Sequence, residues 1–229
     1  MFDYSASDNG FRPHDLVFAD AGALTGPTPA WALHAVAEGA PLVVRRAPRN
    51  ARGVPVGVRG ASRGERHGDR VAAHAIARRY APEAIAQARA WCSHARRRGV
   101  PAIAALDVAA DVLDSMRWPW GVTGAVGYEL ATGHPAAHAR SDLDLLLRAS
   151  EPIDRAQARA LQTALAAAPV RCDVQIETPV GGMALADWAS KARQVLIKSD
   201  TGPFLCTDPW DATSPTEAGA PDACAGARG

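Results

Sequence analysis

The sequence predicts an α+β protein with a small N-terminal α+β domain (residues 11–75) and a larger C-terminal domain (residues 82–210) with a mixed sheet flanked by helices. Hydrophobic residues make up 48% of the 229, enough for a substantial core. Short β-branched runs mark the first half, and helical and strand-like patterns alternate through the second. Residues 1–10 are polar and 211–229 are rich in Ala, Gly, Pro and Thr, so we expect a flexible N-terminus and a disordered tail.

The N-terminal domain is expected to hold one helix and two strands. Helix-forming residues after a Pro-x-Trp start, with Gly39 to end them, predict a helix within 27–40. The β-branched runs 41–47 and 53–60 predict a hairpin or two adjacent strands. The stretch 64–80 is expected to be a connector with a short helix at its end.

The C-terminal domain is expected to alternate helices and strands. Helices are predicted where Pro or Asp opens an apolar-periodic stretch, and strands where apolar and polar residues alternate. The expected helices span 81–99, 101–116, 154–168 and 181–192. The expected strands span 141–149, 170–178 and 194–199, and a glycine-rich turn lies within 118–133.

Composition and charge are those of an ordinary intracellular protein. The formal net charge of +1 is too small to indicate a nucleic-acid partner. The four cysteines form no C-x-x-C pair, which favours a reducing cytosol over a disulfide scaffold or a zinc site. Neither a signal peptide nor an apolar stretch of membrane-spanning length is apparent, so we expect a cytoplasmic protein without membrane contact.

Two aspartates open the predicted strand at 141–149. Successive side chains of a strand point to opposite faces, so Asp142 and Asp144 share one face, and Leu143, Leu145 and Leu147 share the other and can be buried there. Asp173 stands in the next predicted strand. If the two strands pair, three carboxylates converge, and clustered carboxylates persist most easily around a divalent cation. The pattern therefore predicts a site for Mg²⁺ or Mn²⁺.

Upstream of these strands, glycines at 124 and 127 would let backbone amides approach an anion. Two glycines near a turn are a weak signal by themselves. The order of glycine-rich turn, D-x-D strand, helix and Asp-containing strand is more specific, and it favours metal-dependent phosphoryl chemistry.

The segments "TGAVGYELATG", "SDLDLLL" and "DVQIETP" resemble the nucleotidyltransferase fold of the DNA polymerase β superfamily, in which Gly-Ser precedes D-x-D and a third Asp follows on a neighbouring strand. Together with "RPHDL", "PLVVRRA", "GVPVGVRG" and "GPFLCTDPW", they resemble the phosphoribosyl-dephospho-CoA transferases of malonate decarboxylase, also called malonate decarboxylase holo-acyl-carrier-protein synthases. The resemblance covers residues 11–210 and implies a nucleotidyltransferase-like palm in the C-terminal domain.

The resemblance implies transfer of 2′-(5-triphosphoribosyl)-3′-dephospho-CoA to a serine of the malonate decarboxylase acyl carrier protein, with release of diphosphate. It implies that Asp142 and Asp144 bind Mg²⁺, and that Asp173 completes the metal site and helps to deprotonate the serine. These three are the candidate catalytic and metal-binding residues. Gly124 would lie against the polyphosphate. The superfamily's small hydroxyl residue is replaced here by Ala125, so one hydrogen bond to the phosphates would be missing.

Further candidates for substrate binding come from hydroxyl and basic side chains. Thr123 could replace the missing hydroxyl. Eight arginines lie between residues 45 and 70 against two acidic residues, and arginine pairs well with phosphate while a basic surface suits an acidic carrier protein. The candidates for contact with the donor or the carrier are Thr123, Gly124, Ala125, Arg45, Arg46, Arg59 and Lys198.

Histidine and tryptophan have simpler explanations beside functional ones. His14 is a candidate ligand or base, but a structural hydrogen bond to Asp15 or to the backbone is the favoured interpretation. Trp118, Trp120 and Trp188 could stack on adenine, but core packing is favoured for them.

Two other functions remain open at this point. One is a different magnesium-dependent nucleotidyltransferase that uses ATP or CTP on another acceptor. The other is a non-catalytic module that binds a nucleotide or a partner, for which Ala125 is the one supporting residue. A nucleic-acid binder is disfavoured, because the arginine-rich stretch lacks interleaved aromatic residues and the chain lacks overall positive charge.

Overall fold

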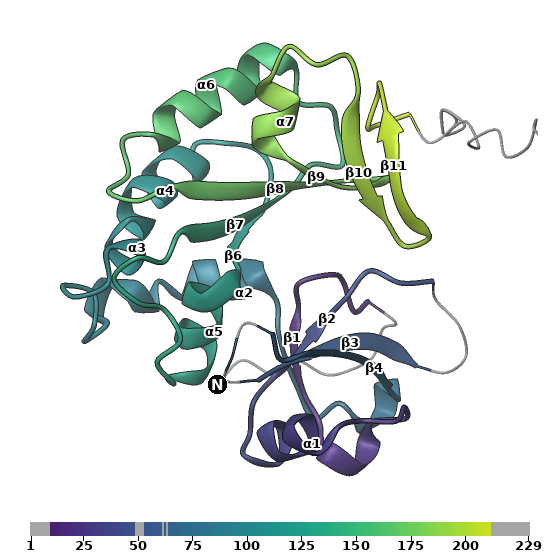
Figure 1. Ribbon diagram of the computed structural model, residues 1–229. Helices are drawn as coiled ribbons and strands as arrows, with labels where there is room; N and C mark the ends of the chain where they lie inside the picture. Colours follow the sequence, from purple (N-terminus) through teal and green to yellow (C-terminus); the bar gives the residue numbers. More distant parts are fainter. Residues whose placement is uncertain (1–9, 49–52, 61, 63, 212–229) are drawn as a thin grey trace, which may run out of the picture.

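The computed structural model describes residues 10–48, 53–60, 62 and 64–211. The predicted flexible N-terminus and disordered tail therefore fall almost wholly outside the described residues. Figure 1 shows one β-sheet in each half of the chain, with helices on both, and the predicted α+β class is confirmed. No helix in the described part of the chain is long and apolar enough to span a bilayer.

The N-terminal half forms a five-stranded antiparallel sheet in the order β4-β3-β2-β1-β5. Its strands are β1 (Leu16–Phe18), β2 (Leu42–Val44), β3 (Val54–Arg59), β4 (Arg66–Val71) and β5 (Arg78–Tyr80). The predicted helix is α1 (Ala30–Ala37), and short 3-10 turns lie at η1 (Ala21–Ala23) and η2 (Ala73–Ala75). Helix α1 packs one face of the sheet, with Val17, Leu42 and Val56 fully buried beneath it.

The prediction of a connector at 64–80 is wrong, because this stretch contributes strands β4 and β5. Strand β4 pairs with β3 along its whole length, and the side chain of Arg45 lies against Gly57 of β3 and Gly68 of β4. The partner strand supplies the hydrogen bonds that hold this polar segment extended, and those bonds leave no periodicity in the sequence itself. Strand β5 carries the N-terminal sheet past the predicted domain end at 75.

The C-terminal half forms a six-stranded mixed sheet in the order β11-β10-β9-β8-β7-β6. Strands β7 and β8 are parallel, and the other neighbours are antiparallel. The strands are β6 (Trp120–Val122), β7 (Leu143–Arg148), β8 (Cys172–Thr178), β9 (Gly181–Ala184), β10 (Val195–Ser199) and β11 (Gly202–Cys206). The predicted strands at 141–149, 170–178 and 194–199 are confirmed as β7, β8 and β10.

Helices lie on both faces of this sheet. They are α2 (Pro82–Ala88), η3 (Ala90–Ser93), α3 (Pro101–Ala104), α4 (Leu106–Leu113), α5 (Gly124–Thr132), α6 (Arg155–Leu165) and α7 (Leu185–Ala189). Figure 1 shows α6 and α7 on the side of the sheet away from the N-terminal domain. The predicted helix start at Asp154 is confirmed by a capping box, in which its carboxylate accepts from the Gln157 backbone N–H at 2.7 Å.

Several predicted helices are shorter or different in kind. The helix expected at 81–99 ends at Ala88, where Arg89 adopts a left-handed conformation with φ 51°. The stretch expected as a turn, 118–133, is strand β6 followed by helix α5. The helix expected at 181–192 begins as strand β9, because its glycines pair with β8, and only α7 is helical. Strand β11 was not predicted.

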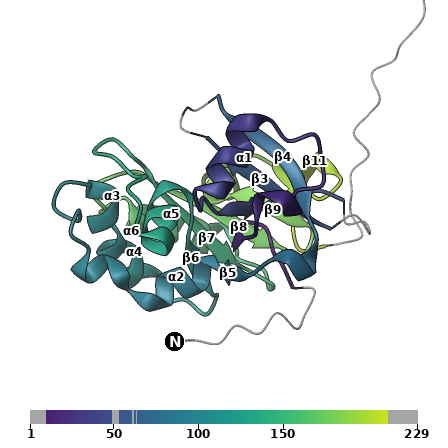
Figure 2. The same cartoon turned by 90° about the horizontal axis from the view of Figure 1, so that it is seen from below.

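Ion pairs join the two halves of the chain. Arg46 after β2 pairs with Glu177 of β8, and both side chains are largely buried. Arg148 at the end of β7 pairs with Glu83 of α2, and Arg12 from the N-terminal domain contacts the same carboxylate at 2.9 Å. Figure 2, seen from below, shows the N-terminal domain in front of β8 and β9. These contacts fix how the first sheet faces the second.

Candidate active site

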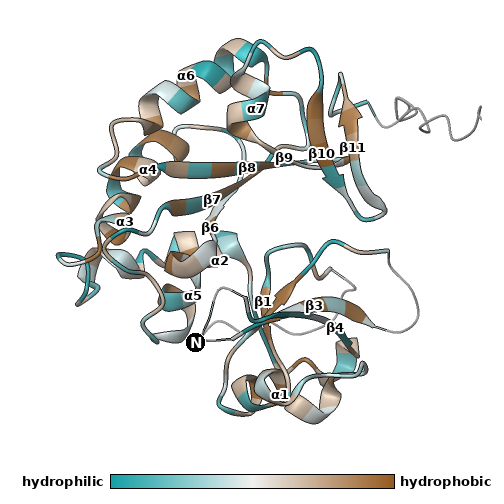
Figure 3. Ribbon diagram, in the orientation of Figure 1, coloured by the Kyte–Doolittle hydropathy of each residue, from teal (hydrophilic) through white to brown (hydrophobic). Residues whose placement is uncertain are grey.

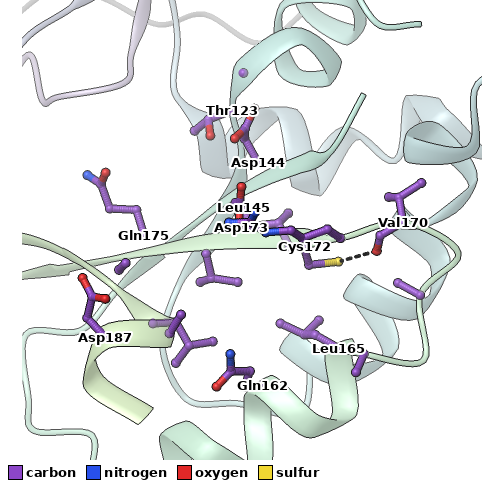
Figure 4. A pocket seen from close by; sticks show the side chains of 18 of the residues that line it. Thr123, Asp144, Leu145, Gln162, Leu165, Val170, Cys172, Asp173, Gln175 and Asp187 are labelled. Carbon is purple, nitrogen blue, oxygen red and sulfur yellow. Dashed lines mark hydrogen bonds and ion pairs between the residues drawn. The ribbon is translucent and has the colours of Figure 1, made fainter. Parts of the chain in front are cut away.

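A cavity of about 970 Å³ is lined by residues from both halves of the chain. The N-terminal domain contributes His14 and Arg59 to its wall, and the rest comes from the C-terminal domain. The polar groups of its C-terminal wall include Thr123, Asp144, Gln162, Arg171, Asp173, Gln175, Asp187 and Lys198. Figure 4 shows Asp144 and Asp173 close to Thr123, with Gln162 and Leu165 on a more distant wall.

The register of the central strands aligns the two cavity carboxylates. In the parallel pair β7–β8, Asp144 stands directly opposite Asp173. On the other face of β7, Leu143, Leu145 and Leu147 are almost completely buried. The leucines therefore anchor the strand in the core while the aspartate on the opposite face reaches the cavity.

Asp142 is placed differently from the other two carboxylates. It precedes β7, its side chain is exposed, and it is not among the residues that line the cavity. It is still close enough to influence Asp144 electrostatically. The structure thus brings Asp144 and Asp173 together and leaves Asp142 at the margin.

Asp144 has a perturbed acidity. Burial raises the pKa of its carboxyl, and the charges of Asp173 and Asp142 raise it further, while Arg59 and His14 act in the opposite direction. Asp144 makes no ion pair with a basic side chain among the described residues. A half-buried carboxylate beside two others is a group whose ionised form a divalent cation would stabilise.

The donor set fits a magnesium ion that is held mainly by substrate. Among the described residues no three His, Cys, Asp or Glu side chains are gathered into a ready-made metal cluster. Mg²⁺, however, is commonly bound through one or two carboxylates, with water and substrate phosphates completing its shell. Asp144 and Asp173 supply two such carboxylates, and Asp173 is shared with Arg171 at 2.6 Å on the exposed rim.

Gly124 lies against the carboxylate of Asp144. Its φ is +60°, and a Cβ at this position would overlap the Asp144 side chain. Glycine is therefore required on two counts, conformation and space. The backbone N–H of Thr123 donates to the Asp144 carbonyl at 3.0 Å, which ties the start of α5 to β7.

The first turn of α5 faces the cavity through Thr123 and Gly124. The Thr123 hydroxyl makes no capping hydrogen bond to the helix, so it is available to a ligand. Helix N-termini leave backbone N–H groups without partners inside the helix and attract anions. Ala125, by contrast, packs against the hydrophobic core and is not part of the cavity wall.

The predicted basic residues divide into two groups. Arg59 and Lys198 line the cavity from opposite domains. Arg45 and Arg46 do not line it: Arg45 lies across β3 and β4, and Arg46 pairs with Glu177. Two of the four predicted phosphate partners, Arg59 and Lys198, therefore lie at the cavity. The other two, Arg45 and Arg46, contact other residues of the fold instead.

His14 reaches the cavity from the N-terminal domain. Its backbone has φ 76°, an uncommon conformation for a residue with a side chain, and its N–H donates to the Val44 carbonyl at 3.0 Å. Its Nε2 lies 2.8 Å from Nε2 of Gln175, which in turn donates to Glu177 at 2.6 Å. The favoured sequence interpretation, a structural hydrogen bond to Asp15 or to the backbone, does not include this side-chain link across the domains, which could not be derived from the order of residues alone.

Glu177 is a strongly ionised carboxylate at the domain boundary. Burial acts to raise its pKa, but the His14 and Arg46 side chains, the Arg46 charge and the Gln175 amide together lower the pKa to about 2.

The thiol of Cys172, at the other end of β8 and on the cavity wall, has its pKa raised to about 11 by burial and by Asp173. Cys172 is thus a neutral thiol at ordinary pH, unsuited to act as a nucleophile.

The three tryptophans belong to the core, as favoured from the sequence. Trp118, Trp120 and Trp188 are each at least nine-tenths buried, and none lines the cavity. The Trp188 ring N–H donates to the Ile153 carbonyl at 2.7 Å. Sequence reasoning did not single out Gln162 and Asp187, which face the cavity from α6 and α7 and carry no distinctive motif.

Comparisons with known proteins show the family of the chain. The chain matches two family models, "Phosphoribosyl-dephospho-CoA transferase MdcG N-terminal domain" over residues 12–82 and "Phosphoribosyl-dephospho-CoA transferase MdcG C-terminal domain" over residues 85–209. The chain is therefore a transferase enzyme.

Curated relatives give the same result at full length. Phosphoribosyl-dephospho-CoA transferases from Pseudomonas putida, Azotobacter vinelandii and Klebsiella pneumoniae are 47%, 43% and 40% identical to it. These matches cover 87–88% of this chain and 94–96% of each relative. The chain belongs to the phosphoribosyl-dephospho-CoA transferase family. The comparison with solved structures found no match.

Proposed function

We propose that this enzyme transfers the 2′-(5-triphosphoribosyl)-3′-dephospho-CoA prosthetic group to a serine of the malonate decarboxylase acyl carrier protein. The observation that carries the proposal is the alignment of Asp144 with Asp173 beside Gly124 in the cavity. The name of the family to which the chain belongs, phosphoribosyl-dephospho-CoA transferase, supports the same reaction. Paired carboxylates next to a helix N-terminus suit a metal-bound polyphosphate.

In this reaction the serine oxygen attacks the α-phosphorus of the donor. A new oxygen–phosphorus bond forms, the bond from the α-phosphorus to the bridging oxygen breaks, and diphosphate leaves with the electron pair. The hydroxyl proton passes to Asp173, which is partly exposed and can hand it to water. The product is a phosphodiester between the prosthetic group and the carrier.

Side chains of both domains would bind and orient the donor. Thr123 and the backbone of Gly124 are placed to hold phosphate oxygens, and Arg59 and Lys198 to neutralise their charge from either side. Asp144 and Asp173 would hold Mg²⁺, with Asp142 as a third carboxylate close by. When bound, the ion would polarise the phosphoryl oxygens and neutralise charge on the departing diphosphate.

The test is to incubate the enzyme with Mg²⁺, the triphosphoribosyl-dephospho-CoA donor and the carrier protein, and to weigh the carrier by mass spectrometry. We expect a mass gain equal to the donor minus diphosphate, abolished by changing the acceptor serine to alanine. No gain, beside an active control enzyme of the family, would overturn the proposal. Modification with ATP or CTP but not with this donor would select the alternative nucleotidyltransferase.

A further inference from the structure

The hairpin β10–β11 carries an exposed pair of leucines at the edge of the catalytic sheet. Leu196 is 45% exposed and Leu205 is 49% exposed, and they stand directly opposite each other in the antiparallel register. Figure 3 shows hydrophobic colour on both strands of this hairpin. Among the described residues, Leu33 of α1, at 39%, is the remaining exposed large hydrophobic side chain.

The register places this pair on the face that carries the active-site residues. Lys198 of β10 pairs with Gly182 of β9, which pairs with Glu177 of β8. The next row on the same face, two residues further along each strand, therefore contains Leu196 of β10, Ala184 of β9 and Gln175 of β8. Both Ala184 and Gln175 line the cavity. The leucines thus continue the cavity wall outward to the sheet edge.

The opposite face of the same hairpin is ordinary core. Val195 and Ile197 alternate with the exposed residues of β10, and both are buried in the main hydrophobic cluster. The exposure of Leu196 and Leu205 is therefore confined to the cavity face, beyond the part of it that the N-terminal domain covers through Arg46 and Glu177. A paired apolar surface on an edge strand is a liability for a protein that has no use for it.

We propose that Leu196 and Leu205 form the docking surface for the acceptor protein, an inference that rests on the proposed function. An acceptor of protein size cannot enter a cavity of about 970 Å³; only the modified side chain can, so the surface around that residue must lie on the rim. The rim here offers two apolar side chains and, one row away, the exposed cation Lys198. The surface fits a partner with apolar side chains beside its modified hydroxyl and a carboxylate within reach of Lys198.

The test measures the Michaelis constants for carrier and for donor separately. In the variant Leu196→Thr/Leu205→Thr, the side chains favour strands but lose apolar area, and we expect KM for the carrier to rise about 10-fold. We expect KM for the donor to stay within about two-fold, because the cavity itself is unchanged. The matched control is Leu33→Thr on α1, which should leave both constants unchanged.

An unchanged carrier KM in the double variant would overturn this inference. So would a wild-type dimer that the double variant converts to a monomer without altering carrier KM, because the leucines would then serve a second copy of the chain. A wild-type enzyme that fails to modify the carrier at all would instead overturn the proposed function. Circular dichroism and melting temperatures of the variants show whether the hairpin still folds.

Discussion

The carboxylates at the two ends of the strand pair β7–β8 have pKa values that are shifted in opposite directions. At one end Asp144 faces Asp173, no arginine of the described residues pairs with Asp144, and burial with the neighbouring carboxylates raises its pKa. At the other end Arg148 stands opposite Glu177, and the pKa of Glu177 is lowered to about 2 by its partners despite its burial. The same strand pairing therefore has one end where carboxylates repel each other, here called the strained end. At its other end, the satisfied end, the carboxylate of Glu177 is paired with basic and polar groups.

Residues at one end of the strand pair are therefore candidates for catalysis, and residues at the other end hold the two domains together. The satisfied end joins the two domains through Arg46 and Glu177, and through Arg12 and Glu83. The strained end opens on the cavity, where a cation and phosphates would relieve the repulsion. A substitution should therefore affect activity at one end and stability at the other.

The largest expected effect is on activity at the strained end. Asp144→Asn should lower kcat/KM for carrier modification by roughly 100- to 10,000-fold. Its melting temperature near pH 7 should be equal or higher, because a carboxyl with a raised pKa in the folded state disfavours folding once it is ionised. A large drop in melting temperature would contradict the comparison.

Asp142→Asn is the matched substitution two residues away. We expect its half-saturating Mg²⁺ concentration to rise by about 10- to 100-fold, with no change in melting temperature, because Asp142 is exposed. An unaltered Mg²⁺ dependence would remove Asp142 from the metal site and leave two carboxylates in it.

Gly124→Ala should lower kcat by about 100-fold, because its Cβ would displace the Asp144 carboxylate. The control is Gly133→Ala at the end of α5, where φ is also positive, at 75°, but nothing lies within 4 Å of the added Cβ. That control carries the same kind of backbone cost, about 1 kcal/mol, without the clash. Equal activity losses in both variants would show that backbone strain, and not contact with Asp144, is responsible.

At the satisfied end, Glu177→Gln should destabilise the protein by about 3 kcal/mol at pH 7, because Arg46 loses its buried partner. The pKa of Glu177 is lowered from 4.5 to about 2, so its stabilisation is present above pH 4.5 and is lost as the pH falls toward 2. Wild type should therefore lose more stability than the variant over this range in denaturant titrations.

The control for this pair is Glu151→Gln, which breaks an exposed ion pair with Arg117. An exposed pair contributes at most about 1 kcal/mol, so this variant should be nearly as stable as wild type. Similar losses in the two variants would show that the burial of Glu177 contributes nothing.

The smallest expected effect concerns Arg171, which pairs with Asp173 on the exposed rim. Arg171→Ala should change the free energy of unfolding by less than about 1 kcal/mol, because Arg171 is 72% exposed. Chemical denaturation measures this directly. A loss as large as that of Glu177→Gln would mean that the cavity end also supports the fold.

The alternation of strands β7 and β8 could be predicted from the sequence, because it is local and repeats every two residues. It predicted that Asp144 and Asp173 would converge if the two strands pair, which they do, whereas the contact of Gly124 with the Asp144 carboxylate was not predicted. The position of Asp142 could not be predicted so well, because the strand begins one residue after it. Strand ends depend on partners that the order of residues does not reveal.

Contacts between the domains could not be predicted from the sequence for a different reason. Arg45 and Arg46 looked like phosphate ligands because arginine chemistry is the same in both roles, and only the fold shows that Glu177 is within reach of Arg46. His14 reaches Gln175 across 161 positions of chain. Strands β4, β5 and β11 were missed because their stability comes from paired neighbours more than from their own composition.

The side-chain alternation along β7 also constrains how this segment can change by insertion or deletion. Adding or removing a single residue near Leu143 would turn the strand over, sending Asp144 into the leucine-lined core and a leucine into the catalytic opening. Substitutions here can be graded in effect, whereas a one-residue shift in length would destroy core and chemistry together. The length of this strand segment therefore constrains the proposed site as strongly as the identity of its aspartates does.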